Sequence, residues 1–240
     1  MESRSFTGSD GRVLGGRALK RKVRDLLNRP DLDRALEELC RMPARQVINP
    51  LFSFLHRGDE KAKWAAVTAM GAIVAQLADQ DMEAARIILR RLMWNLNDES
   101  GGIGWGSPEA MGEILARHKG LAEEYAHILV SYARLDGNYL EHEMLQRGLL
   151  WGIGRVAQVR PDFLQNSVQH LIPYLRSKDP TVRALAARIM GFLDIEGARR
   201  DLERLTRDVA EVSFWDDGRL FRGRVKDVAE GALVRLSSVH

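Results

Sequence analysis

Acidic and aromatic side chains gather in two neighbouring stretches of the chain, where they could hold a positively charged group. The first stretch is the Gly-rich segment 97–109, and the second is 141–143, which reads Glu-His-Glu. Carboxylates around an aromatic ring suit a guanidinium or ammonium group, through charge-assisted hydrogen bonds and a cation–π contact. We therefore predict one shared binding surface made by eight residues: Asn97, Asp98, Glu99, Trp105, Glu109, Glu141, His142 and Glu143.

The Gly-rich segment breaks a local rule of helix formation. Its four glycines would each cost a helix about 1 kcal/mol, and such a break without structural gain is typical of functional segments. The structural alternative is that this loop bends the chain or seats Trp105 in the core. We expect a helix to restart here, with Ser107 as its N-cap and Pro108 at its first position. The spacing of the glycines fits no phosphate-binding loop.

Metal binding and catalysis are weaker interpretations of the same residues. A metal needs three or four convergent ligands, and His142 with its neighbouring carboxylates shows no ligand spacing such as His-x-x-x-His. No Ser/His/Asp or Cys/His set can be assigned from spacing either. We therefore predict no metal, no cofactor and no catalytic residue.

The elements that position these residues follow from an internal repeat. Four glycines stand in matching contexts at steps of 41, 40 and 39 residues: Gly71, Gly112, Gly152 and Gly191. A period near 40 residues indicates an array of helical pairs, and apolar residues recur at helical spacing before each Gly. Each Gly is therefore expected in the second helix of a pair.

The repeat predicts the position of every helix. We expect pairs at 44–57 with 60–78, 83–97 with 107–118, 121–135 with 141–158, 164–177 with 180–193, and 198–209 with 223–237. Helices at 17–28 and 31–42 would form an N-terminal cap within 17–43, which leaves 44–240 as repeats of one domain, 17–240. Residues 1–16 are expected to be a mobile tail. Segment 211–222 forms either a hairpin around its Asp-Gly or a loop tucked against the array.

One stretch carries a family resemblance. Asp179-Pro180-Thr181-Val182-Arg183, followed by small residues and Gly191, resembles the HEAT repeat family, close to its short phycobilisome-lyase-like variant. The resemblance covers roughly 44–236, although the third unit lacks the Val-Arg pair at its turn. It implies an all-α, right-handed α-α superhelix, a HEAT/armadillo-like solenoid of about five helical pairs with an N-terminal helical cap.

The resemblance says little about function, since this family includes scaffolds, lyases and DNA glycosylases. We predict a non-catalytic scaffold or adaptor whose acidic, aromatic surface holds a basic peptide, a basic protein or a small cationic ligand. The alternative is an enzyme or cofactor handler, lyase-like or similar to the alkylpurine DNA glycosylases. Trp94, Asp98 and Trp151 resemble the residues of those glycosylases in type only. Segment 94–143 carries nine acids against three basic residues, and the net charge of the chain is only +3, so we do not expect a nucleic-acid partner.

Composition limits the class of protein. The chain has 240 residues, of which 45% are hydrophobic and 29% charged, with a net charge of +3, as in a globular protein. Residues 1–30 nevertheless carry eight Lys or Arg against three acids. The single cysteine, Cys40, can form no disulfide within the chain and is expected in an apolar, buried position. Without a long apolar run, we expect a cytoplasmic protein and no membrane partner.

Overall fold

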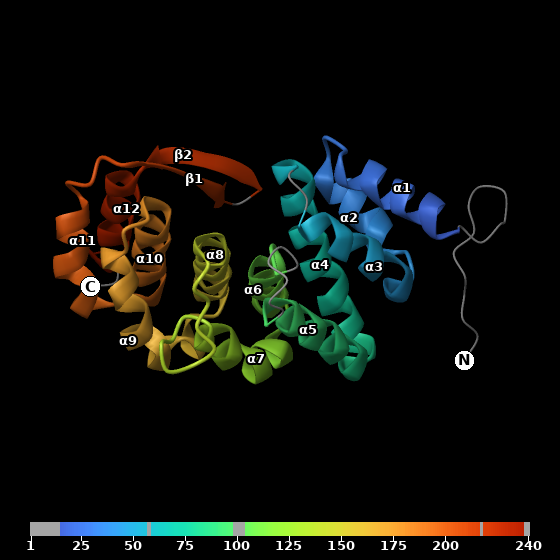
Figure 1. Ribbon diagram of the computed structural model, residues 1–240, viewed down its shortest axis with the longest axis horizontal. Helices are drawn as coiled ribbons and strands as arrows, with labels where there is room; N and C mark the ends of the chain where they lie inside the picture. Colours follow the sequence, from blue (N-terminus) through green and yellow to red (C-terminus); the bar gives the residue numbers. More distant parts are fainter. Residues whose placement is uncertain (1–14, 57–58, 98–103, 217, 238–240) are drawn as a thin grey trace. The chain divides into compact units, whose positions relative to one another are not determined.

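The computed structural model describes residues 15–56, 59–97, 104–216 and 218–237 (Figure 1). These residues form helices connected by short loops, and one two-stranded sheet, so the predicted all-α repeat fold is confirmed. The chain divides into two compact units, Met1–His118 and Lys119–His240. Within the described residues, no helix combines the length and the apolar character needed to cross a membrane.

The first unit contains six helices in the part that is described. They are α1 (Gly16–Leu27), α2 (Leu32–Cys40), α3 (Ala44–Leu55), α4 (Glu60–Gln80), α5 (Met82–Leu96) and α6 (Ser107–Arg117). Asp31, Asp59 and Asp81 cap the N-termini of α2, α4 and α5, because each carboxylate accepts a hydrogen bond from a backbone N–H of the first turn. The cap helices α1 and α2 pack against each other and against α3 and α4.

Helix α6 begins differently from the sequence prediction. Its N-cap is Gly106, with a φ of 78°, and Ser107 is already inside the helix, so the predicted Ser107 cap is wrong by one residue. A Cβ on Gly106 would lie 2.6 Å from the carbonyl oxygen of Leu55. Both the left-handed backbone and this close approach require glycine. At least this glycine therefore has a structural reason. It is not the seating of Trp105 in the core that the sequence offered as an alternative, because Trp105 is 41% exposed.

The second unit contains the remaining elements. They are α7 (Lys119–Ser131), α8 (Glu143–Val159), η1 (Pro161–Phe163), η2 (Gln165–Ser167), α9 (Val168–Leu171), η3 (Ile172–Arg176), α10 (Pro180–Leu193), η4 (Glu196–Ala198), α11 (Arg199–Leu205), β1 (Glu211–Asp216), β2 (Arg219–Arg224) and α12 (Val225–Ser237). The continuous helix predicted at 164–177 is wrong: this segment is a short α-helix between 3₁₀ turns. Pro173 explains the break after Leu171, because proline supplies no N–H to continue the helix.

The four repeat glycines all lie in second helices, as predicted. Gly71 is in α4, Gly112 in α6, Gly152 in α8 and Gly191 in α10, and all four are buried. A Cβ on Gly71 would lie 2.5 Å from Cγ of Glu113 in α6, and one on Gly191 would lie 2.8 Å from Cα of Ala232 in α12. These two glycines therefore let the neighbouring second helices approach closely.

Ion pairs link each of three second helices to the following repeat. Nζ of Lys63 in α4 lies 2.8 Å from Oε1 of Glu109 in α6. Nε of Arg147 in α8 lies 2.5 Å from Oδ2 of Asp179, the N-cap of α10. Arg183 in α10 lies 2.7 Å from Oδ2 of Asp208, which precedes β1. We call these three pairs the charge ladder.

Strands β1 and β2 pair as an antiparallel hairpin, which confirms one of the two predicted alternatives for 211–222. Phe214 lies opposite Phe221, with ring centroids 4.9 Å apart, and its side chain is buried. The indole N–H of Trp151 in α8 donates to the carbonyl oxygen of Trp215 at 2.6 Å, and Arg188 in α10 pairs with Asp216. The hairpin is therefore fixed on the second helices of its unit.

Candidate functional site

The structure divides the predicted surface between the two units. Asn97, Trp105 and Glu109 belong to the first unit, and the Glu-His-Glu stretch 141–143 belongs to the second. Asp98 and Glu99 lie outside the described residues. The sharing of one surface by both groups therefore stays a prediction, and each group is considered by itself.

In the first unit, Glu109 is not the surface acid that the sequence suggested. Its side chain is only 3% exposed and forms the charge-ladder pair with Lys63, whose ammonium lies 5.0 Å from the centre of the Trp64 ring. Burial lowers the pKa of Lys63, but the charge and hydrogen bond of Glu109 outweigh it, so the pKa is raised overall. Asn97 ends α5 and is exposed, and Trp105 is 41% exposed. Glu109 therefore has a structural role: it links α4 to α6 as a buried ion-pair partner.

In the second unit, the predicted residues Glu141, His142 and Glu143 are all exposed. His142 is the N-cap of α8, and its Nδ1 accepts a hydrogen bond from the backbone N–H of Met144 at 3.2 Å. The two carboxylates at this end of α8 are free to meet a charged group from solvent.

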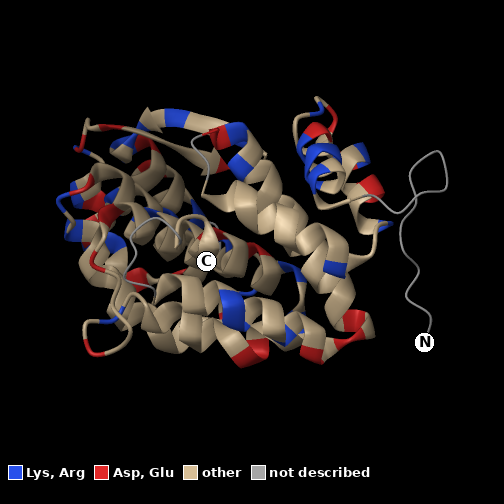
Figure 2. Ribbon diagram, turned by 45° about the vertical axis from the view of Figure 1, so that its right-hand side comes forward, with Lys and Arg blue, Asp and Glu red and all other residues tan. Residues whose placement is uncertain are grey.

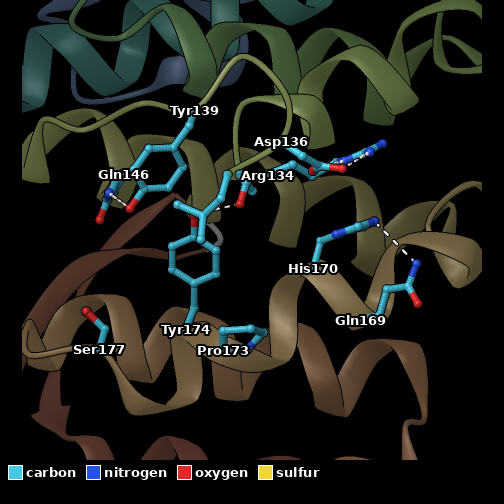
Figure 3. A pocket seen from close by; sticks show the side chains of 11 residues that line it. Arg134, Asp136, Tyr139, Gln146, Gln169, His170, Pro173, Tyr174 and Ser177 are labelled. Atoms are coloured by element: carbon cyan, nitrogen blue, oxygen red, sulfur yellow. Dashed lines mark hydrogen bonds and ion pairs between the residues drawn. The ribbon is translucent and has the colours of Figure 1, made fainter.

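A cavity of about 470 Å³ is lined by residues that precede and follow the Glu-His-Glu stretch in the sequence (Figure 3). The loop that follows α7 forms one side, and the segment α9–η3 forms the other. The lining residues are Ala133, Arg134, Leu135, Asp136, Tyr139, Gln146, Gln169, His170, Pro173, Tyr174 and Ser177. A volume of this size is within the range of small-molecule and side-chain sites.

Hydrogen bonds of two tyrosines fix the interior of the cavity. The hydroxyl of the buried Tyr174 donates to the carbonyl oxygen of Ala133 at 2.9 Å, which ties η3 to the loop after α7. The side-chain amide of Gln146 donates to the Tyr139 hydroxyl at 2.9 Å and to the Leu140 carbonyl at 2.8 Å. Figure 3 shows both rings facing the cavity. The Tyr139 hydroxyl, having accepted a bond, can still donate its proton to a ligand.

The surroundings of two cavity residues, Asp136 and Tyr174, shift their pKa values. Arg134 donates to both carboxylate oxygens of Asp136, at 3.1 and 2.8 Å, and these hydrogen bonds lower the pKa of Asp136. Burial raises the pKa of Tyr174, with a further contribution from Tyr139, so its phenol stays neutral. Leu135 stands at the opening with 84% of its surface exposed. Among the described residues, no group of three His, Cys, Asp or Glu side chains could hold a metal ion.

Sequence reasoning missed the cavity residues Tyr139, Gln146 and Tyr174. One signal was present, because the turn of the third pair lacks the Val-Arg motif of the repeat. The contact that closes the cavity joins Tyr174 to Ala133, which lies 41 residues earlier, and no local pattern predicts it. Cys40 also differs from expectation: it is half-buried and lines a second cavity, of about 430 Å³, in the first unit.

Comparisons with known proteins agree with the repeat. A model described as a HEAT-like repeat matches residues 143–193. A protein of Archaeoglobus fulgidus, described only as uncharacterized, is 27% identical over 179 residues, which cover 74% of this chain and 91% of that protein.

Two solved structures share the fold. An engineered protein has a TM-score of 0.52 at 16% identity, over 92% of this chain and 96% of its own. A designed armadillo repeat protein in complex with the peptide (KR)4 has a TM-score of 0.50 at 18% identity, over 91% and 99%. At these identities the likeness shows the fold alone. The chain is thus an all-α helical repeat protein with a fold similar to these structures, and its residues 143–193 match a HEAT-like repeat.

Proposed function

We propose that this chain is a non-catalytic binding scaffold whose third-repeat turn, residues 132–143, holds a segment of protein or peptide with basic character. One observation carries the proposal: a cavity with two tyrosines lies where the turn departs from the repeat, and the exposed acids Glu141 and Glu143 stand in the sequence between its lining residues Tyr139 and Gln146. Gln146 lines the cavity and lies three residues after Glu143 on α8, so the two side chains share one side of the helix.

The arrangement provides two kinds of contact for such a segment. An apolar side chain of the partner would enter the cavity, against Pro173 and the rings of Tyr139 and Tyr174. Lys or Arg residues beside it would reach Glu141 and Glu143, which are exposed and therefore screened by salt. The apolar contact would supply the part of the affinity that does not depend on salt, and the acids would supply selectivity for positive charge.

The fold supports this proposal without establishing it. A designed protein of the same fold was solved with a peptide of alternating Lys and Arg, (KR)4. The remaining predicted residues, Asn97, Asp98, Glu99, Trp105 and Glu109, would extend the surface from the first unit. Of these, the buried Glu109 could contribute only by holding its helix in place.

The test is fluorescence anisotropy with labelled (KR)4 and with a second peptide in which one central residue is Trp. We expect the Trp peptide to bind more tightly and the double variant E141Q/E143Q to bind both peptides several-fold more weakly, with a larger effect at low salt. The control, E203Q/E230Q, removes two exposed acids of α11 and α12 and should change little. Equal weakening by both double variants would show only general attraction by charge. D98N/E99Q should also weaken binding if both units share the surface.

A further inference from the structure

Helix α1 carries a row of positive side chains that the proposed function does not use. Arg17, Lys20, Arg21 and Arg24 follow the spacing i, i+3, i+4 and i+7, which places them on one side of the helix. All four are exposed, whereas the opposite side buries four apolar residues of α1 in the first unit: Leu19, Val23, Leu26 and Leu27. We call the four exposed residues the α1 cationic row. In Figure 2, blue segments follow one another along the N-terminal helices.

Three members of the row have no compensating acid nearby. Arg24 bonds Asp25 at 3.0 Å, but in the described part of the chain no acid lies within ion-pair distance of Arg17, Lys20 or Arg21. By contrast, Lys22, which lies off the row, pairs with Glu38 at 3.2 Å. The fold therefore neutralises the cation that contacts α2 and leaves Arg17, Lys20 and Arg21 to solvent.

The row also opposes the dipole of its own helix. The N-terminal end of a helix is partially positive and favours acids, yet the first turn of α1 contains none. Arg17 lies in this first turn, where positive charge destabilises a helix. The N-cap, Gly15, provides no side-chain hydrogen bond that would offset this cost. A local rule broken in this way, on a helix that is otherwise well packed, indicates a function.

We propose that the α1 cationic row binds the phosphate backbone of a nucleic acid. The row spans about 10 Å of helix, since seven residues rise 1.5 Å each, and duplex DNA presents roughly one charge per 1.7 Å of its axis. Three of the four side chains are arginines, whose planar guanidinium can donate two parallel hydrogen bonds to one phosphate. Because the phosphates of a duplex lie so close together, even a short, narrow row of cations can contact several of them.

Two features favour nucleic acid over an anionic membrane. A helix that binds a bilayer inserts an apolar side into it, but the apolar side of α1 is buried inside the first unit. The exposed side carries its charges along a line rather than over a broad plane, and its only apolar side chain is that of Ala18.

The experiment measures binding of a labelled 20-base-pair duplex of mixed sequence at 50 to 200 mM salt. The variant R17Q/K20Q/R21Q removes three unpaired charges, and K178Q/R200Q/R219Q removes three exposed cations of the second unit as a matched control. Three phosphate contacts predict that affinity falls about 40-fold across this fourfold change in salt. We expect the α1 variant to lose most of this dependence and the control to keep it.

A second readout separates a binding role from a structural one. Because all three side chains are exposed, their neutralisation should shift the melting temperature by no more than about 2 °C, while binding is lost. Three results would overturn the proposal: no binding to the duplex at 50 mM salt, equal loss of binding in both triple variants, or row-dependent binding to phosphatidylserine vesicles without binding to the duplex. Since the row lies far along the chain from Glu141 and Glu143, this test is independent of the peptide test.

Discussion

The contact at Gly191 predicts that the same substitution, glycine to alanine, has opposite effects at two neighbouring helices. A Cβ on Gly191 would lie 2.8 Å from Cα and 2.9 Å from Cβ of Ala232 in α12. Carbon atoms pack at about 3.5–4.0 Å, so α10 and α12 would have to separate by roughly 0.7 Å. The obstructing atoms belong to the backbone and to a methyl group attached to it, and neither can rotate away.

The magnitude follows from two opposing terms. Overpacking of a close helix contact costs about 1–3 kcal/mol, and alanine gains about 1 kcal/mol over glycine in the middle of a helix. The net effect of G191A should be a loss of about 1 kcal/mol, or about 2–4 °C in melting temperature for a chain of this size. At Gly231, within α12, no atom lies within 4 Å of the added Cβ. G231A should therefore keep the full gain and stabilise by about 0.5–1 kcal/mol.

Urea unfolding, followed by circular dichroism and by tryptophan fluorescence, measures both variants against the unmodified chain. The expected result is a lower midpoint for G191A and a higher midpoint for G231A, with unchanged slopes. The reasoning is refuted if G191A is as stable as the unmodified chain, or if both variants shift in the same direction. Gly71 is a useful third position, because its nearest obstruction, Cγ of Glu113, belongs to a side chain that can move.

Three further predictions concern ion pairs and the cavity. K63M should lower the free energy of unfolding by about 3–5 kcal/mol, because Glu109 would stay buried without its partner, and K63M/E109Q should recover much of this loss in urea unfolding. Y174F removes the hydrogen bond to the loop after α7. It should lower the free energy of unfolding by about 1 kcal/mol and weaken the binding of the Trp peptide. The hydrogen bond from Arg176 lowers the pKa of Asp201. This ion pair therefore stabilises the folded state at pH values above the ordinary carboxyl pKa, and the stabilisation is lost as the pH falls through the lowered pKa of Asp201. D201N should therefore destabilise by about 0.5–1 kcal/mol at pH 7 and by nothing near pH 2, as measured by unfolding at each pH, since Arg176 is mostly exposed.

The sequence predicted those parts of the fold that depend on short-range rules. Asp59 and Asp179 cap their helices as expected, because an acid before a helix satisfies backbone N–H groups within three residues. Gly71 and Gly191 marked the second helices, because a Cβ at either position would collide with the next second helix. A physical requirement that recurs once per repeat leaves a periodic trace in the sequence.

The parts that were missed depend on contacts between distant residues. Glu109 looked like a surface acid because nothing local shows that Lys63, 46 residues earlier, buries it as an ion pair. The helix predicted at 164–177 failed at Pro173, where the tertiary fold accepts 3₁₀ turns that place Tyr174 on the loop after α7. Burial, and contacts between residues distant in the sequence, therefore determined the features that the periodicity of the sequence could not predict.

The third repeat shows how a repeat protein can form a site without losing its connection between repeats. Lys63 and Arg183 stand eight residues before their repeat glycines and hold the charge ladder, but the third turn lacks this residue. Arg147 takes the role five residues before Gly152, about one helical turn later, and still reaches Asp179 at 2.5 Å. In all three repeats the basic partner lies inside the second helix, so the link does not depend on the turn before it. Residues of the third turn can therefore line the cavity while the ladder is kept.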